Sequence, residues 1–132
     1  MQTNKSILTT VNYSSYTGDM LFTHDNLGVY LIDYKSTFMT HNIKLVKWEK
    51  NAVSEQEFDL TQERIEIPYK ENMKMCLTKD DKTLFVGLDK RVLVYNTETM
   101  TITKEFNVEG IIVEISLIND AKSLFVASHD GN

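Results

Sequence analysis

The sequence predicts an all-β fold in which groups of short antiparallel strands repeat along the chain. First, the segment Asp-x-Lys-Ser/Thr-x-Phe occurs three times, at 33–38, 80–85 and 120–125, with spacings of 47 and 40 residues. Second, each copy lies between short apolar runs, and Asp, Lys and Ser residues typical of tight turns separate those runs. A repeat of this period indicates an array of similar structural units.

Each complete unit is expected to hold four strands. In the first unit they are 29–32, 38–39, 43–48 and 57–60, and in the second they are 73–77, 84–86, 91–95 and 101–106. Trp48 and Tyr95 take equivalent places in the third strands, 47 residues apart. A four-stranded antiparallel sheet repeated with this period is one blade of a β-propeller.

The predicted blades divide the chain, residues 1–132, into one partial propeller. We expect a half blade at 6–23, complete blades at 27–61 and 72–108, and a half blade at 111–130. The charged stretch 61–72 is expected to be a longer connection. A helix starting at Ser54 is an alternative to the fourth strand of the first blade, but the alternation of Phe58 and Leu60 favours a strand.

Composition excludes several classes of protein. The chain has 132 residues, of which 42% are hydrophobic and 25% charged, as in a single globular domain. Its net charge of −5 disfavours a nucleic-acid partner held by bulk electrostatics. No apolar run reaches the roughly 18 residues of a membrane helix, and the N-terminus lacks the apolar core of a secretory signal. The single cysteine, Cys76, fits a reducing compartment, so a cytoplasmic location is expected.

The order of several short motifs resembles that of the WD-repeat (WD40-like) β-propeller family. Residues 16–26, Tyr-Thr-Gly-Asp-Met-Leu-Phe-Thr-His-Asp-Asn, are similar to the Thr-Gly opening and the histidine of the following loop. Trp48-Glu49 and Tyr95-Asn96 stand where the family has Trp-Asp, and 128–131 resembles the end of a second strand. The resemblance covers nearly the whole chain. It implies a non-catalytic protein–protein interaction scaffold, with other proteins as partners and no cofactor.

The resemblance also implies a structural network within the first blade. In the family, His, Ser/Thr, Asp and Trp form a buried set of hydrogen bonds, and the matching positions here are His24, Thr40, Asn42 and Trp48. Asn42 replaces the aspartate, so the network would lose its charge. His24 is expected to be buried. The second blade offers no histidine, so apolar packing is expected to stabilise the blades more than this network does.

Histidine, cysteine and tryptophan are weighed first as candidate chemical groups. His24, His41 and His129 do not occupy equivalent repeat positions or metal-ligand spacing, so they are interpreted as structural or solvated. Cys76 lies in a predicted strand, so a core thiol is expected rather than a nucleophile. Trp48 is expected to be a core residue.

The charged groups have structural interpretations too. The acidic cluster at Glu55–Glu66 is accompanied by the basic residues Lys50, Arg64 and Lys70, so it is interpreted as an ordinary solvated edge. The alternative is an acidic contact surface for a basic protein partner. The recurrent aspartates and lysines of the repeated segment offer too few oxygen ligands for calcium and no basic stripe for nucleic acid, so turn formation is expected. They are Asp33, Asp80, Asp120, Lys35, Lys82 and Lys122.

No catalytic, cofactor-binding or metal site is therefore predicted, and the protein is not expected to be an enzyme. A ligand-binding or enzymatic propeller of another subfamily, and a structural subunit of a cytoskeletal or trafficking complex, are the alternatives. Three blade-equivalents cannot close a ring that typically needs about four to eight blades. Either the chain is a piece of a longer protein, or half blades of two copies complement each other and give six blades.

Overall fold

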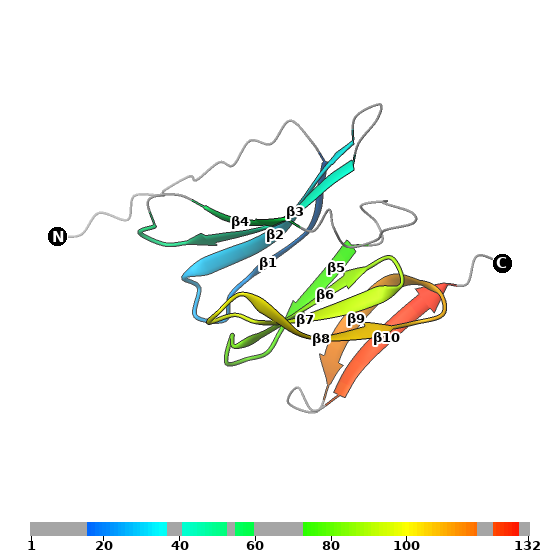
Figure 1. Cartoon of the computed structure of the whole chain (residues 1–132). Helices are drawn as coiled ribbons and strands as arrows, with labels where there is room; N and C mark the ends of the chain where they lie inside the picture. Colours follow the sequence, from blue (N-terminus) through cyan, green and yellow to red (C-terminus); the bar gives the residue numbers. More distant parts are fainter. Residues whose placement is uncertain (1–15, 37–40, 53–54, 60–72, 119–122, 130–132) are drawn as a thin grey trace.

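The computed structural model describes residues 16–36, 41–52, 55–59, 73–118 and 123–129. These residues form three antiparallel sheets, with strand orders β1-β2-β3-β4, β5-β6-β7-β8 and β9-β10 (Figure 1). The strands are β1 Tyr16–Phe22, β2 Gly28–Ser36, β3 His41–Glu49, β4 Gln56–Asp59, β5 Met73–Leu77, β6 Thr83–Leu88, β7 Arg91–Asn96, β8 Thr101–Asn107, β9 Ile111–Ile118 and β10 Ser123–His129.

The sheets follow one another in chain order, and their first strands are neighbours. β1 contacts β5, and β5 contacts β9, so the second sheet lies between the other two. Within each sheet, consecutive strands pair side by side. This is the arrangement of propeller blades, and the predicted all-β fold class is confirmed.

The first sheet begins earlier than the sequence predicts. β1 pairs with β2 along Met20–Phe22, so this segment opens the first sheet instead of ending a preceding half blade. The first sheet therefore spans 16–59, which corrects the expected divisions at 6–23 and 27–61. β4 is a strand, and not the helix considered as an alternative. The strand expected over 6–13 and the connection at 61–72 lie outside the described residues.

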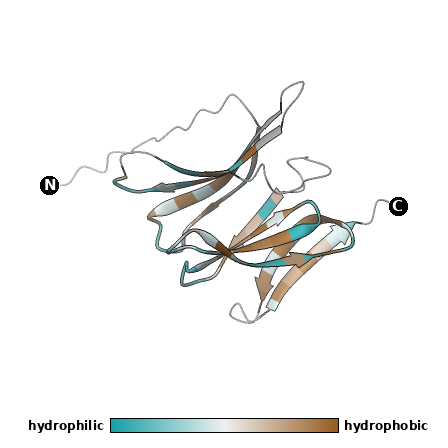
Figure 2. Ribbon diagram, in the orientation of Figure 1, coloured by the Kyte–Doolittle hydropathy of each residue, from teal (hydrophilic) through white to brown (hydrophobic). Residues whose placement is uncertain are grey.

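Two apolar clusters join the three sheets. One lies between the first and second sheets and includes Tyr30, Leu45 and Leu84, which are each at most 2% exposed. The other lies between the second and third sheets and centres on Val92 and Ile112. Because the second sheet is covered on both faces, four consecutive β7 residues are buried. Figure 2 shows the resulting hydrophobic strands in the middle of the molecule.

Gly87 permits the close approach of the third sheet. A Cβ at this position would lie 3.2 Å from Ile112 Cγ2 and 3.5 Å from Ile115 Cγ2. A larger side chain on β6 would therefore push β9 away from the second sheet.

Candidate functional site

The turn between β1 and β2 is built by a threonine and an aspartate. The Thr23 hydroxyl donates to Asp25 Oδ1 at 2.5 Å, and the Leu27 amide donates to the same oxygen at 2.9 Å. The Gly28 amide returns a hydrogen bond to Thr23 Oγ1 at 2.9 Å. The hydroxyl and the amide lower the pKa of Asp25 below its usual value, because they stabilise the carboxylate. Asn26 has a left-handed φ of 62°, which asparagine tolerates well.

The turn between β5 and β6 repeats the same hydrogen bonds. The Thr78 hydroxyl donates to Asp80 Oδ1 at 2.6 Å, and the Lys82 amide donates to it at 3.0 Å. The Thr83 amide donates to Thr78 Oγ1 at 3.1 Å. The pKa of Asp80 is lowered for the same reason, and Asp81 takes the left-handed position with a φ of 61°. Thr-x-Asp is therefore the structural repeat of these turns.

This finding corrects part of the sequence interpretation. Asp80 forms a turn, as predicted. Asp33 does not, because it lies inside β2, where it pairs with Thr17 and Lys44. The repeated segment at 33–38 is thus not equivalent to the one at 80–85. Asp120 lies outside the described residues.

A carboxylate from the second turn holds the first turn. Asp81 Oδ1 accepts hydrogen bonds from the backbone amide and from Nδ1 of His24, both at 2.8 Å, and Asp81 Oδ2 accepts from the Asp25 amide at 3.1 Å. The Thr97 hydroxyl donates to the Asp81 carbonyl at 2.6 Å and ties the same turn to the loop after β7. These contacts join two sheets through polar groups.

The inner strands have a second polar link. β1 has a bulge between Thr17 and Met20, and Asp19 lies within it. Asp19 Oδ1 accepts from the Met20 amide at 2.9 Å, while Oδ2 accepts from the Met75 amide of β5 at 2.8 Å. One carboxylate therefore binds the backbones of two sheets.

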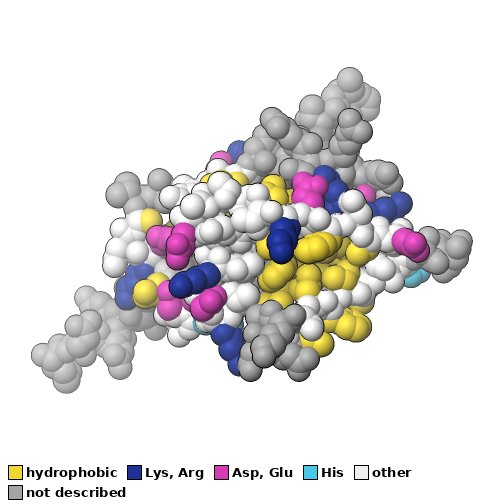
Figure 3. All heavy atoms as spheres, turned by 60° about the horizontal axis from the view of Figure 1, so that its bottom comes forward, with side chains coloured by type: hydrophobic (Ala, Val, Ile, Leu, Met, Phe, Trp, Pro, Cys, Tyr) yellow, Lys and Arg dark blue, Asp and Glu magenta, His cyan; other side chains and the backbone are white. Residues whose placement is uncertain are grey.

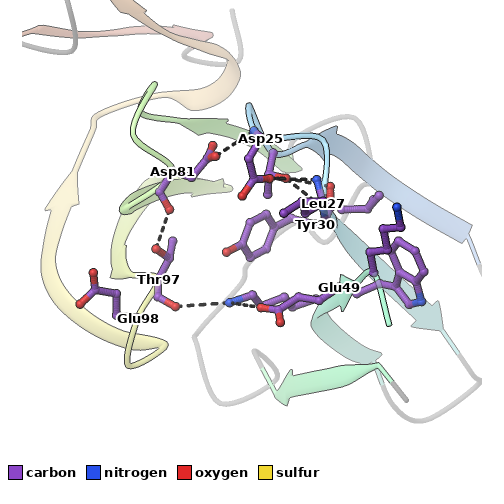
Figure 4. A pocket seen from close by; sticks show the side chains of 13 residues that line it. Asp25, Leu27, Tyr30, Glu49, Asp81, Thr97 and Glu98 are labelled. Carbon is purple, nitrogen blue, oxygen red and sulfur yellow. Dashed lines mark hydrogen bonds and ion pairs between the residues drawn. The ribbon is translucent and has the colours of Figure 1, made fainter. Parts of the chain in front are cut away.

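Between the two turns lies an open hollow of about 520 Å³. Figure 4 shows Asp25, Leu27, Tyr30 and Glu49 on one side, with Asp81, Thr97 and Glu98 facing them from the second sheet. Among the described residues, four carboxylates and two lysines line it, so this described lining is net acidic. The lining residues are Thr23, Asp25, Leu27, Gly28, Val29, Tyr30, Lys47, Trp48, Glu49, Lys50, Asp81, Thr97 and Glu98.

One lysine of the lining is held by neighbouring groups. Lys47 Nζ lies 3.0 Å from Glu49 Oε1, 3.4 Å from the Thr97 carbonyl and 5.7 Å from the centre of the Tyr30 ring. Burial opposes its charge, but the hydrogen bond to Glu49 and the negative charge of that carboxylate outweigh burial, so the pKa of Lys47 is raised. Burial raises the pKa of Tyr30, whose ring is 2% exposed. Lys47 is therefore a structural cation of the hollow.

The structure describes the side chains of two of the four residues of the predicted network, His24 and Trp48. The His24 side chain is 47% exposed and bonds to Asp81 of the neighbouring sheet, so its expected burial is wrong. Trp48 is partly buried and lines the hollow. Thr40 and the Asn42 side chain lie outside the described part of the chain, so the network as a whole stays a prediction. Sequence reasoning missed Asp81, although the repeated Thr-x-Asp followed by Asn or Asp was a usable signal.

The structure also shows the surroundings of Cys76, His129 and Glu57. Cys76 packs with Phe85 and Ile112, and burial raises its pKa to about 12, so it is a protonated core thiol as predicted. The described residues include no group of three His, Cys, Asp or Glu that could hold a metal ion. They also include no helix long and apolar enough to cross a membrane. His129 is exposed on β10, and Glu57 pairs with Lys44 at 3.1 Å on an exposed edge.

Comparison with known proteins supports the fold. The chain is similar to the β-propeller domain of Cps50 (Swd1) from Myceliophteria thermophila, with a TM-score of 0.60 and 16% identity over 89% of this chain and 37% of that one. It is also similar to hydrazine synthase from Kuenenia stuttgartiensis, with a TM-score of 0.64 and 11% identity over 92% of this chain and 47% of that one. No family model and no curated protein matches the sequence.

The chain has a β-propeller fold. It spans less than half the length of either solved protein, 37% and 47%. At identities of 11% and 16%, the likeness concerns the fold alone.

Proposed function

We propose that the protein is a non-catalytic protein-interaction module, a propeller segment of the WD-repeat type that binds a partner protein at the hollow between its first two sheets. The observation that carries this proposal is the hollow itself, an open space of about 520 Å³ built by loops of two blades. Its volume suits a short segment of polypeptide or a small ligand. The side chains that line the hollow favour a segment of polypeptide.

The lining combines apolar contact with negative charge. Leu27 is 51% exposed at the mouth, and the partly buried Trp48 lies in the same wall. Glu49 and Glu98 are exposed, and Asp25 keeps a lowered pKa. A partner segment with a lysine or arginine beside an aliphatic or aromatic side chain would complement both features. Trp48 and Leu27 would provide the buried contact, and the acidic side chains would orient the partner segment.

The geometry disfavours an enzymatic propeller. His24 and Asp81 form a 2.8 Å pair, which could suggest a general base. However, the same carboxylate accepts two backbone amides, and the Thr97 hydroxyl already donates to the Asp81 carbonyl. The Thr23 hydroxyl is committed to Asp25. These groups therefore build turns, and the pair is a structural contact.

The proposal includes a role within a multiprotein complex, with other proteins as partners, and the likeness to the Swd1 propeller domain supports only the fold that such a role would use. Hydrazine synthase is named as an enzyme, so the fold alone does not decide between binding and catalysis. A cytoplasmic location is part of the proposal, supported by a single buried thiol. Neither nucleic acid nor membrane is proposed as a partner, given the net charge of −5.

Selection from a random-peptide phage library tests the proposal. We expect selected peptides that carry lysine or arginine next to an apolar residue, with affinity lost in the Glu49→Lys, Glu98→Lys double variant. Glu109→Lys is the matched control, because Glu109 is exposed and does not line the hollow. Selection of peptides whose binding is unchanged in the double variant would refute the assignment of the hollow.

A further inference from the structure

The outer face of the third sheet carries side chains that correspond in sequence to those joining the first sheet to the second. Asp25, Asp80 and, by its place in the sequence alone, Asp120 provide a common reference for comparing the positions. Five residues after it stand Tyr30, Phe85 and Phe125. An aromatic residue therefore stands at this position in all three sheets.

In two of the sheets, the aromatic residue packs on the sheet that follows. Tyr30 is 2% exposed and belongs to the cluster shared with the second sheet. Phe85 packs with Ile112 and Ile115 of the third sheet. Phe125 lies between Leu124 and Val126, which both face the second sheet, so its ring points to the opposite face and is 59% exposed.

The carboxylate that links the first sheet to the second has a counterpart in the third sheet, whereas the second sheet has Lys74 at this position. Six residues before the reference aspartates stand Asp19 in β1 and Glu114 in β9, each beside a bulge. Asp19 accepts from the next backbone amide, of Met20, and Glu114 accepts from the next amide, of Ile115, at 3.1 Å. The second oxygen of Asp19 binds the Met75 amide of the following sheet. The exposed Glu114 is placed to bind a following sheet in the same way.

The complementary surface is present at the other end of the chain. Five and three residues before the reference aspartate, the second sheet has Met75 and Leu77, which are 6% and 7% exposed because they pack toward the first sheet. The same positions in the first sheet are Met20 and Phe22, which are 54% and 64% exposed. Leu21, between them, faces the second sheet, so Met20 and Phe22 point away from it.

We propose that the outer face of the third sheet, with Phe125 and Glu114, binds the outer face of the first sheet of a second copy, with Met20 and Phe22. The order of inner strands, β1, β5, β9, then continues with β1, β5 and β9 of the other copy. Two chains related by a two-fold axis would close one ring of six sheets. We match this surface to a second copy of the chain because its aromatic packing would repeat a contact that the chain already makes twice, and Glu114 would repeat the polar contact that Asp19 makes once.

Figure 3 brings the lower side of Figure 1 forward and shows hydrophobic side chains gathered on the side of the molecule where β9 and β10 lie. An exposed hydrophobic residue on another strand provides the control. Phe106, 48% exposed, lies on β8, the fourth strand of the second sheet, away from the inner strands. A charge at Phe106 should therefore leave the proposed contact intact.

The test is the mass of the chain in solution by light scattering and native mass spectrometry. The wild type is expected at twice 15.3 kDa, about 31 kDa, at micromolar concentration. Phe125→Asp and Phe22→Asp should each weaken the dimer at least about 10-fold, and Phe106→Asp should not. A circular dichroism spectrum with retained strand content establishes that each variant is folded, and Glu114→Lys provides an independent variant on a polar, exposed position.

Mixing the two variants tests the head-to-tail arrangement. A mixed dimer of Phe125→Asp and Phe22→Asp chains retains one intact contact of the two, so it is expected to form at concentrations at which each variant alone is largely monomeric. The proposal is overturned by a wild type that stays at 15.3 kDa, by growth beyond two chains, by a mixture that stays monomeric, or by equal loss in Phe106→Asp. This inference does not depend on the hollow, so peptide binding and dimerisation can fail separately.

Discussion

The Asp81 carboxylate allows the polar link between the first two sheets to be measured. Asp81→Gly removes three hydrogen bonds, two from backbone amides and one from His24 Nδ1. His24 is 47% exposed, so water replaces part of what is lost and the full penalty of a buried unpaired amide does not apply. We expect a loss of about 1–2 kcal/mol in the free energy of unfolding, with the ionic part discounted for solvent screening.

Glycine also changes the backbone, and Asn26→Gly corrects for this. Asn26 and Asp81 occupy the same turn position, with φ of 62° and 61°, so glycine relieves the same left-handed conformation in both. The two variants are compared by urea unfolding at equal protein concentration, because any association would shift the apparent stability. A difference below about 0.3 kcal/mol between them would show that the carboxylate contributes nothing to joining the sheets.

Three further predictions concern packing, acid stability and the thiol. Gly87→Val should cost about 1–3 kcal/mol in thermal or urea unfolding, because its new carbons meet Ile112 Cγ2. Ile112→Ala, which removes that methyl group, should restore part of the loss in this background, and independent effects of the two substitutions would contradict the contact. Because folding lowers the pKa of Asp25 and Asp80, the stability that these carboxylates contribute is present above their ordinary pKa of about 4 and is lost as pH falls through their folded values. The Asp25→Asn, Asp80→Asn double variant should therefore show a flatter decline of the unfolding midpoint between about pH 5 and 2 than the wild type does. An unchanged slope in this variant would be evidence against the turn contacts. Cys76, with a pKa of about 12, should react slowly with iodoacetamide at neutral to mildly alkaline pH and rapidly in urea, and equal rates would contradict its burial.

The second sheet could be predicted from the sequence because each of its strands is a local pattern. Short apolar runs separated by Asp-Asp-Lys and Asp-Lys predict β5, β6 and β7, and the predicted strand ends lie within a residue or two of the observed ones. Both faces of this sheet are covered, so its runs are nearly continuous and easily found. The all-β fold class followed from the same patterns.

The first sheet was harder because its repeated segment misled the alignment. Asp33 is followed by Lys and Ser, like Asp80, but it lies in the long strand β2. What defines the turn is a threonine hydroxyl two residues before the aspartate, which Asp25 and Asp80 share. Composition of a segment does not reveal which side chains bond to its backbone.

The hollow could not be predicted, because it depends on how two sheets meet. Trp48 was expected in the core on account of its repeat position. Its place at an open wall follows from the loops of the neighbouring sheet, with Asp81 and Thr97 opposite. Such contacts join residues far apart in the chain, like His24 and Asp81, and no local pattern specifies them.

The central claim is that a basic, partly apolar segment of another protein occupies the hollow. Trp48 is the only tryptophan of the chain and lines that space, so its fluorescence reports directly on occupancy. Titration with a library-selected peptide should give a saturable change in Trp48 emission, which the Glu49→Lys, Glu98→Lys variant loses and Glu109→Lys retains. Peptide binding measured by calorimetry without any change in Trp48 emission, or with the same affinity in the double variant, would contradict the account.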